Sequence, residues 1–242
     1  MNRQPKEIKD LRGFVVEWAE RGDYYISRRD VVFHSPDLKR PFKRLAQIEA
    51  PLWRRIASRF RLGQRLLRFM VTNIIPLSNG DLFVTFDKSV GVIRKGVYFS
   101  LAGLERPCRV LRSACALDGN GDIFFGEYLD NADRGPMRVY RYSQGDDGMA
   151  VAFTFPAGSI RHVHGIYRDD FTDDLYCLTG DAESECRILR TSDKFQTMET
   201  VGEGDETWRA VSMVFTEDSI YYGTDAEYRA NQIYRIDRKT GE

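Results

Sequence analysis

Long apolar runs are missing from this 242-residue chain. No segment approaches the roughly 18 to 20 uninterrupted apolar residues of a membrane span. The opening stretch, MNRQPKEIKDLRGFVV, is too polar for a secretion signal. If Met1 is the natural start, these absences predict a cytoplasmic location. Reduced thiols are then expected at the four cysteines, Cys108, Cys115, Cys177 and Cys186.

Several catalytic and cofactor motifs are absent as well. The chain has no phosphate loop, no GxSxG nucleophile elbow and no dinucleotide fingerprint, so no organic cofactor is expected. Zinc-finger spacing and aromatic-rich RNA-binding motifs are also missing, which argues against nucleic acid as a partner. With 36 basic and 36 acidic side chains and 42% hydrophobic content, the composition suits a folded protein with a sizeable core.

The chain instead contains a repeat. Five times, a short turn with an acidic or small polar residue leads into an aromatic or β-branched strand, as in GDLFVT and GDIFFG. The anchor residues of these turns are Asp23, Asp81, Asp122, Asp174 and Ser219, separated by 58, 41, 52 and 45 residues. Each spacing fits one four-stranded blade plus its loops. The sequence therefore predicts an all-β fold, a β-propeller of antiparallel blades that begins near Gly22.

The number of repeats suggests an unfinished ring. Propellers with blades of this length close with about six or seven blades, whereas the anchors give five. The fifth repeat has only finished its third strand, IYRID, before the chain ends in RKTGE. We therefore expect one propeller domain over residues 1–242 that is incomplete at its C-terminus.

Some of the turns that follow the third strands carry a family resemblance. In ILRTSDKFQTMETVG, the residues Thr191, Asp193 and Thr197 match the Ser/Thr-x-Asp-x-Gly-x-Thr-Trp pattern of an Asp-box, although Phe195 replaces its Gly and Met198 its Trp. YRYSQGDDGMAVAF and FHSPDLKRPF are looser copies. The Asp of such a turn bonds nearby backbone amides. The chain thus resembles the sialidase-like (BNR or Asp-box repeat) propellers, which implies a carbohydrate-associated protein.

Three arginines stand at or near the start of consecutive first strands. Arg112, Arg161 and Arg209 are separated by 49 and 48 residues, about one repeat each. We therefore expect their guanidinium groups to converge at the channel mouth, where a planar fork suits a carboxylate. The resemblance implies the same role, because sialidases hold the substrate carboxylate with three arginines. In the alternative interpretation, each arginine pairs with an acid of a neighbouring blade.

The string RHVHG, residues 161–165, holds two of the three histidines in the chain. Alternation along a strand places His162 and His164 on the same face. The pair could bind a divalent metal, with Asp181 or Glu127 as a third ligand, or supply a general base and its partner. It could equally be a hydrogen-bonded pair that lines the channel. The sequence leaves these three interpretations open.

Acidic residues recur just beyond the second strands, on the face expected for the arginines. They are Asp87, Glu127, Asp181 and Asp225. A carboxylate pair can protonate a glycosidic oxygen and activate water, and Tyr128 beside Glu127 resembles the tyrosine nucleophile and carboxylate of sialidases. The candidate catalytic residues are Glu127, Tyr128, His162, His164 and Asp181. The candidate substrate-binding residues are Arg112, Arg161, Arg209 and Asp225. In the alternative interpretation, the acids form salt bridges between blades.

A basic amphipathic segment, residues 51–71, interrupts the first repeat. A helix over Leu52–Met70 would place Trp53, Ile56, Phe60, Leu67 and Met70 on one stripe. Arg54, Arg55, Arg61, Arg65 and Arg68 would lie largely off that stripe. Residues 39–68 hold ten basic side chains and one acid. Such a helix could contact an anionic membrane or a protein partner. We expect it instead to cap a blade with the Trp53 side buried.

These features predict a carbohydrate-active propeller whose partner is an acidic glycan. In the enzyme version, the Arg, His and carboxylate groups cleave that glycan as a glycoside hydrolase or a polysaccharide lyase. In the alternative, the chain is a non-catalytic scaffold that binds a glycan or a protein. Convergence of these side chains in an open pocket would favour the enzyme, whereas salt bridges that fill the channel would favour the scaffold.

Overall fold

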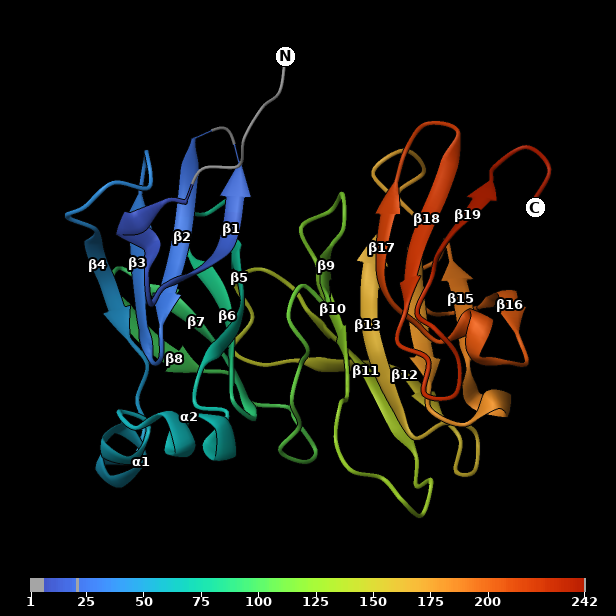
Figure 1. The fold of residues 1–242 in the computed structure, drawn as a ribbon, viewed down its shortest axis with the longest axis horizontal. Coiled ribbons are helices and arrows are strands. Elements are labelled where there is room, and N and C mark those ends of the chain that lie inside the picture. Colours follow the sequence, from blue (N-terminus) through green and yellow to red (C-terminus); the bar gives the residue numbers. More distant parts are fainter. Residues whose placement is uncertain (1–6, 21, 242) are drawn as a thin grey trace. The chain divides into compact units, whose positions relative to one another are not determined.

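The computed structural model describes residues 7–20 and 22–241. The chain divides into two compact units, Met1–Ser100 (unit 1) and Leu101–Glu242 (unit 2). Within the described residues, 19 strands form five antiparallel sheets, each built from strands that are consecutive in the chain (Figure 1). None of the helices among them is long and apolar enough to cross a bilayer.

Unit 1 contains two four-stranded sheets and all the α-helix of the described chain. The first sheet consists of β1 (Val15–Glu20), β2 (Asp23–Arg28), β3 (Val31–Ser35) and β4 (Lys43–Gln47). The second consists of β5 (Val71–Pro76), β6 (Leu82–Phe86), β7 (Ser89–Arg94) and β8 (Val97–Ser100). A short 3-10 turn, η1 (Lys9–Leu11), precedes β1, and the helices α1 (Leu52–Ala57) and α2 (Arg61–Leu67) connect the two sheets.

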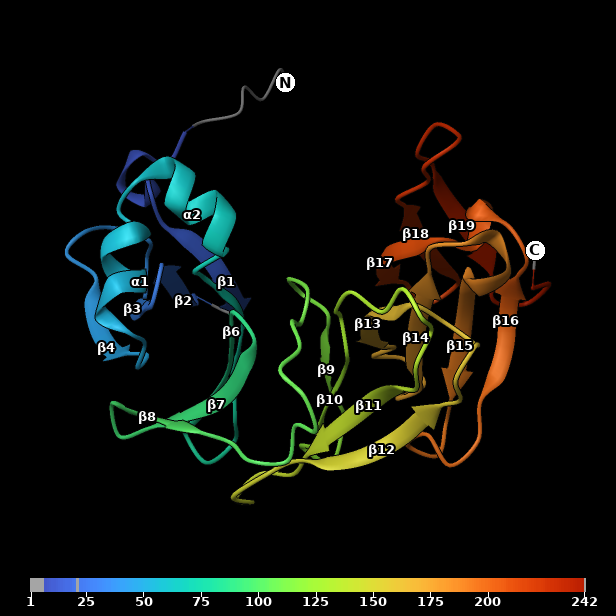
Figure 2. The same cartoon turned by 90° about the horizontal axis from the view of Figure 1, so that it is seen from below.

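Unit 2 contains the other three sheets. They consist of β9 (Cys115–Leu117), β10 (Ile123–Gly126), β11 (Met137–Tyr142) and β12 (Ala150–Phe155); β13 (His162–Arg168), β14 (Leu175–Gly180), β15 (Arg187–Thr191) and β16 (Glu199–Glu203); and β17 (Ala210–Phe215), β18 (Ser219–Thr224) and β19 (Ile233–Asp237). Figure 2 shows β13 to β16 side by side in chain order. Two 3-10 turns, η2 (Glu183–Glu185) and η3 (Glu206–Trp208), precede β15 and β17.

The repeat anchors lie where the sequence predicted, between the first and second strands of each sheet. Asp81 and Asp122 directly precede β6 and β10. Gly80 and Gly121, one residue earlier, have φ angles of +84° and +86°, a backbone region that favours glycine because it has no Cβ atom. The predicted all-β fold, a partial β-propeller with four-stranded blades, is therefore confirmed. Only the last sheet differs, with three strands among the described residues.

The cores lie between the faces of neighbouring sheets within a unit. In unit 2, Phe124 and Val139 of one sheet pack with Val163, Ile166 and Leu189 of the next. The second strands β6 and β14 are buried at every position. β14 lies between two cores of unit 2, because Leu175 and Cys177 belong to one and Tyr176 and Leu178 to the other. Their continuous apolar runs, LFVTF and LYCLTG, follow from this burial. The outer strands β8 and β16 are largely exposed.

The turn after β15 has the bonding expected of an Asp-box. Asp193 Oδ1 accepts the backbone N–H of Thr197 at 2.9 Å, and Thr191 Oγ1 donates to the same oxygen at 2.8 Å. Phe195, which replaces the glycine of the motif, has a φ of +72° and is 2% exposed. Its ring packs against Phe124 at a centroid distance of 5.7 Å. Burial of this ring offsets the strain of a left-handed backbone, which explains the departure from the motif.

The predicted helical insertion is present, but as two helices instead of one. α1 ends at Ala57, and Phe60 has the extended angles φ −94° and ψ 142° before α2 begins. Trp53, Ile56 and Phe60 are 62%, 48% and 69% exposed, so the prediction that this side is buried was wrong. Leu67, at the end of the stripe, is half-buried against the core of unit 1.

Arginines, not apolar side chains, attach α1 to the strands. Arg55 Nε lies 2.9 Å from Asp30 Oδ2, and Arg54 Nη1 lies 2.6 Å from Asp87 Oδ2. Both arginines are half-buried, which leaves the apolar stripe of α1 facing away from these contacts. The side chains of Arg61 and Arg65 are outside the described part of the chain. The helix therefore has the opposite orientation to the one that its amphipathic pattern predicted.

Candidate functional site

Two of the predicted arginines converge on one carboxylate in unit 2. Arg161 directly precedes β13, Arg209 directly precedes β17, and Asp181 directly follows β14. Arg161 Nη1 donates to Asp181 Oδ2 at 3.1 Å, and Arg209 Nη2 donates to Asp181 Oδ1 at 3.0 Å. Residues from two neighbouring sheets thus share a single acid, as the repeat spacing of the arginines suggested.

Each of these arginines also contacts a carboxylate at the surface. Arg161 Nη2 donates to Asp130 Oδ1 at 2.9 Å, and the Asp130 side chain is 83% exposed. Arg209 Nη1 lies 3.5 Å from Glu227 Oε2, and the Glu227 side chain is 60% exposed. The guanidinium groups therefore have a well-covered partner, Asp181, on one side and solvated partners on the other.

The two histidines face the same carboxylate from β13. The pairing of β13 with β14 shifts register between Val163 and Gly165, which makes His164 the extra residue of a β-bulge. The His162 and His164 rings lie 5.1 Å apart between centroids, and their Nε2 atoms are 3.4 and 3.8 Å from Asp181 Oδ1. Both residues are buried. The structure thus confirms that the pair points to one side of the strand.

The site requires close packing at Gly180, the last residue of β14. A Cβ atom at this position would lie 3.1 Å from His164 Cε1 and 3.3 Å from Arg209 Cγ. Such separations are shorter than ordinary van der Waals contact, so a larger residue would displace the imidazole or the arginine stem. Gly180 therefore allows both side chains to approach Asp181.

Electrostatics keep Asp181 ionised. Burial by itself would raise the pKa of this carboxyl group. The facing imidazoles of His162 and His164 and the charge of Arg209 outweigh that effect and hold the pKa of Asp181 far below its ordinary value. Asp181 is consequently an anchor for cationic groups rather than a proton donor at neutral pH.

The arginines and Asp181 open onto a pocket of about 640 Å³. It is lined by Arg134, Arg161, Asp181, Ala182, Glu183, Ser184, Arg209, Glu227 and Tyr228. The Tyr228 side chain is prominent here, since the residue is 85% exposed. Arg134 is held by Glu185, whose Oε1 lies 2.7 Å from its Nε. His162 and His164 do not line the pocket but contact Asp181, which does.

Other predicted site residues lie elsewhere. Glu127 is fully buried, and its carboxylate accepts hydrogen bonds from Arg106 at 2.8 Å and from Tyr140 at 3.0 Å. Tyr128, the next residue, points instead toward His162, with ring centroids 4.2 Å apart. The neighbours Glu127 and Tyr128 therefore do not act on one shared group.

The predicted set of three arginines is only partly assembled. Arg112 and Asp225 are exposed, and neither is among the residues that line the pocket. The third arginine of the pocket is Arg134, from the loop between β10 and β11. Loops between second and third strands were expected on the face of the site, so the position of Arg134 in such a loop could have indicated it. Tyr228 lies in the loop between β18 and β19, which is the same type of loop, so its position carried the same signal.

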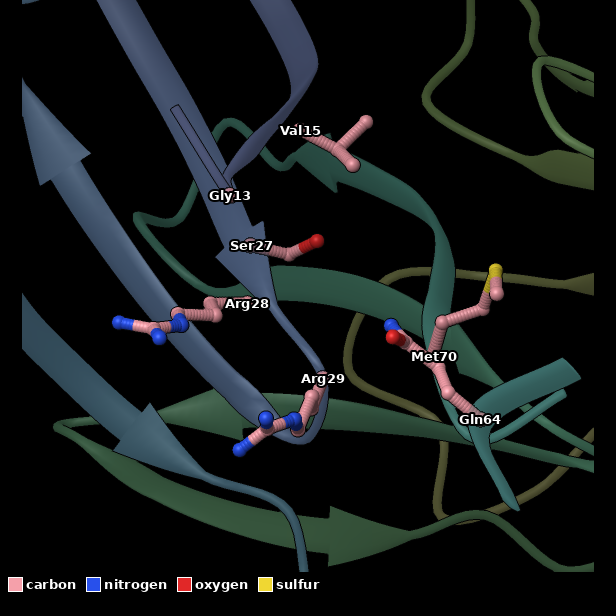
Figure 3. A pocket seen from close by; sticks show the side chains of 7 residues that line it. All are labelled: Gly13, Val15, Ser27, Arg28, Arg29, Gln64 and Met70. Atoms are coloured by element: carbon pink, nitrogen blue, oxygen red, sulfur yellow. The ribbon is translucent and has the colours of Figure 1, made fainter. Parts of the chain in front are cut away.

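A smaller pocket, of about 190 Å³, lies in unit 1 (Figure 3). It is lined by Gly13, Val15, Ser27, Arg28, Arg29, Gln64 and Met70. Figure 3 shows Ser27 and Arg28 extending to opposite sides of β2, as alternation requires. Ser27 Oγ donates to Glu17 at 2.6 Å. This lining contains no histidine and no carboxylate. The pocket of unit 2 instead holds acids and arginines together, and its Asp181 is contacted by His162 and His164.

The blades and their anchor turns define the fold class as a β-propeller, of which this chain supplies a part. No family model matches the chain, and no curated protein matches it in sequence. Solved structures with a similar fold include an ancestral GH74 enzyme, with a TM-score of 0.62 and 14% identity over 94% of this chain and 30% of that one. They also include an exo-β-1,3-galactanase from Phanerochaete chrysosporium with galactose, with a TM-score of 0.51 and 12% identity over 95% and 61%.

A chain from a nidogen–laminin complex is similar too, with a TM-score of 0.56 and 8% identity over 91% of this chain and 73% of that one. At these identities the likeness shows the fold alone. The chain also spans less than a third of the GH74 enzyme. Membership of the sialidase-like group remains a prediction.

Proposed function

We propose that unit 2 binds an acidic glycan in the pocket beside Asp181, and that Arg161 and Arg209 recognise its carboxylate. The observation that carries this proposal is the two-sided pairing of the arginines. Asp181 holds both guanidinium groups from within, whereas the outer contacts are made with the exposed side chains of Asp130 and Glu227. A ligand carboxylate can take the place of these outer partners.

The energetics favour such an exchange. Exposed ion pairs contribute about 0 to 1 kcal/mol, so displacing Asp130 or Glu227 costs little. The inner contacts with Asp181 fix the guanidinium planes before a ligand arrives, which lowers the entropy lost on binding. A sugar carboxylate would then gain charge-assisted, bidentate hydrogen bonds from preorganised donors.

The rest of the lining suits a sugar. The exposed ring of Tyr228 offers an apolar surface with a polar tip, on which the C–H face of a pyranose can lie. Ser184 and Glu183 supply groups that exchange hydrogen bonds with hydroxyls. Similarity in fold to a GH74 enzyme and to a galactanase with galactose supports a carbohydrate ligand.

The same geometry favours binding over cleavage. Glycoside hydrolysis requires a carboxylic acid that can donate a proton at the bound sugar. Asp181 is held ionised by its neighbours, and Glu127 is sealed between Arg106 and Tyr140. A lyase or hydrolase activity would therefore depend on His162, His164 and Tyr128.

The test is calorimetric titration of a panel of acidic and neutral oligosaccharides against the full chain. Arg161→Lys and Arg209→Lys keep the charge but lose the planar fork. Each should weaken binding of an acidic ligand by roughly ten- to a hundredfold, the equivalent of about 1.5 to 3 kcal/mol. Arg190→Lys is the matched control, since Arg190 pairs with Asp174 at 2.7 Å outside the pocket. Equal affinity in all four proteins would refute the proposal. Turnover of any ligand would favour an enzyme over a binding protein.

We propose a second function for unit 1, the docking of an anionic membrane surface by its two helices. Six large apolar side chains on or between the helices are 48% to 73% exposed; they are Leu52, Trp53, Ile56, Phe60, Leu62 and Leu66 (the outer helical surface). Arg59 and Arg68 are exposed in the same segment. Apolar residues flanked by cations match the chemistry of an interface with anionic lipid.

Vesicle sedimentation tests the outer helical surface. The chain should bind vesicles that contain phosphatidylserine at low salt and release them at high salt. Trp53→Ser with Phe60→Ser should abolish the binding. Val97→Ser with Phe99→Ser is the control, because these residues of β8 are 54% and 48% exposed in the same unit. Absence of binding at low salt, or equal loss in both double variants, would remove the membrane from consideration.

A further inference from the structure

We infer that His162, His164 and Asp181 form a binding site for a divalent transition-metal ion such as Zn²⁺. The inference does not depend on glycan binding. One ligand atom from each residue lies within 4.8 Å of the other two. Two imidazoles and one carboxylate are the donor set of many sites with three protein ligands, and all three residues belong to the β13–β14 pair or its immediate end.

The distances suit a metal better than direct hydrogen bonds. His162 Nε2 and His164 Nε2 lie 3.4 and 3.8 Å from Asp181 Oδ1, and the longer separation exceeds hydrogen-bond length. In a tetrahedral site with metal–ligand bonds of roughly 2.0 to 2.1 Å, neighbouring ligand atoms are roughly 3.3 to 3.4 Å apart. The two distances to Asp181 Oδ1 are therefore at or slightly above the separation expected for neighbouring ligands of one ion.

The tautomer of His164 is set for coordination. Its Nδ1 lies 2.9 Å from the backbone carbonyl oxygen of Ala210, and a carbonyl can only accept a hydrogen bond. The proton of the neutral ring is therefore on Nδ1, which leaves a lone pair on Nε2, directed at the Asp181 side. A backbone carbonyl on the outer nitrogen is the usual support for a metal-bound histidine.

His162 supplies the second, independent observation. Its side chain is 7% exposed, yet neither Nδ1 nor Nε2 has a hydrogen-bond partner among the described residues. Buried polar atoms without partners are rare in folded proteins because desolvation of each is unfavourable. Coordination of a metal by Nε2 satisfies one of these two atoms. Tyr128 packs on the ring and leaves its Nε2 edge directed at Asp181.

The surrounding charge accommodates a cation. The ion-pair network around Asp181 contains four arginines, Arg134, Arg161, Arg209 and Arg229, and six acids, Asp130, Asp181, Glu185, Asp205, Glu206 and Glu227. Its formal charge is therefore −2, which a divalent ion neutralises. Arg209 would keep its hydrogen bond to Asp181 Oδ1 and so act as an outer support for the ligating carboxylate.

The geometry also limits the kind of ion. Imidazole nitrogen suits Zn²⁺, Co²⁺ and similar first-row ions, whereas Mg²⁺ and Ca²⁺ prefer sites made of oxygen. Three protein ligands leave a coordination position for water or for a bound molecule. Because Asp181 lines the pocket, the ion would lie beside the proposed glycan site, where it could contact a ligand oxygen.

The experiment uses the full chain, stripped with a chelator and then dialysed against Zn²⁺ or Co²⁺. We expect one Zn²⁺ per chain by elemental analysis. His162→Ala and His164→Ala should each weaken Zn²⁺ affinity at least roughly 100-fold, since loss of even an outer-shell partner lowers affinity 10- to 100-fold. His34→Ala is the matched control: His34 is the remaining histidine, pairs with Asp23 in unit 1, and its loss should leave Zn²⁺ affinity unchanged.

Spectroscopy of the parent chain provides a readout that does not depend on how well the variants fold. Bound Co²⁺ should give the intense visible bands of a low-coordinate site, and X-ray absorption at the zinc edge should show nitrogen and oxygen ligands with imidazole scattering. Sulfur ligation by the cysteines, six oxygen ligands, or no binding by the parent would each overturn the inference. So would Zn²⁺ affinity that is equal in His162→Ala and His34→Ala.

Discussion

Asp87 in unit 1 and Asp181 in unit 2 have the same place in their sheets, directly after the second strand. Their surroundings differ. Asp87 is 9% exposed, and its partner Arg54 comes from the helical insertion. Asp181 is 17% exposed, and its partners Arg161 and Arg209 come from the starts of two first strands. The helix α1 covers Asp87, whereas Asp181 lines a pocket.

The bulged first strands show the same contrast. β5 has its bulge at Thr72 and β13 has its bulge at His164. The Thr72 hydroxyl meets the Thr85 hydroxyl at 2.7 Å, which is a neutral and complete hydrogen bond. The ring of His164 instead directs a nitrogen at a carboxylate 3.8 Å away. The same β-bulge therefore places a hydroxyl for a packing contact in unit 1 and a histidine beside an acid in unit 2.

The strongest test of this contrast is Asp181→Asn. Removal of the carboxylate charge leaves Arg209, 12% exposed, and Arg161 without their shared inner partner. Arg161 keeps Asp130, and Arg209 keeps only longer contacts with Glu206 and Glu227. Because Arg209 is largely buried, loss of its nearest carboxylate should cost about 1 to 3 kcal/mol, and the urea midpoint should fall. Asp130→Asn is the control, because its exposed ion pair should change stability by less than about 1 kcal/mol. Equal effects would mean that Asp181 is no more than a surface acid.

The next prediction concerns pH. Because the folded-state pKa of Asp181 is depressed below its ordinary value of 3.8, the unfolded chain binds this proton more readily than the folded one. The stabilisation by Asp181 is therefore fully present above about pH 4 and is lost as pH falls below it. The stability difference between the parent and Asp181→Asn should be constant from pH 5 to 7 and shrink from pH 4 to 3. Urea titrations of both proteins from pH 3 to 7 measure this difference. A difference that grows as the pH falls would contradict the prediction.

The smallest expected effect is a gain. Glu227→Gln removes the exposed competitor of Arg209, so affinity for an acidic oligosaccharide should rise about two- to fivefold. Glu203→Gln is the matched control, since Glu203 is 54% exposed and pairs with Arg187 at 3.1 Å outside the pocket. A loss of affinity in Glu227→Gln would show that Glu227 contacts the ligand directly instead of competing with it.

Local chemistry made much of the molecule predictable. The glycines before Asp81 and Asp122 require left-handed turns, and the apolar runs after them require buried strands, so five blades could be placed from the residues alone. Alternation placed His162 and His164 on one face, and the repeat spacing brought Arg161 near Arg209. Each of these inferences depends on neighbours within a strand or on one repeat length, which the order of residues records directly.

Long-range pairing decided the rest. The amphipathic pattern of residues 52–70 predicted a buried apolar stripe. In the structure, Arg54 and Arg55 form ion pairs with Asp87 and Asp30, so the arginine side of α1 faces the strands and the apolar side faces solvent. Arg134 lines the pocket, where it donates to Glu185, 51 residues away in the chain, whereas Arg112 is not among the lining residues. Periodicity fixes which face a side chain occupies, whereas a charge–charge contact depends on loop paths and sheet packing. The sequence by itself therefore determined the blades and the strand ends that carry the site, and only the tertiary structure decided which acid each arginine contacts.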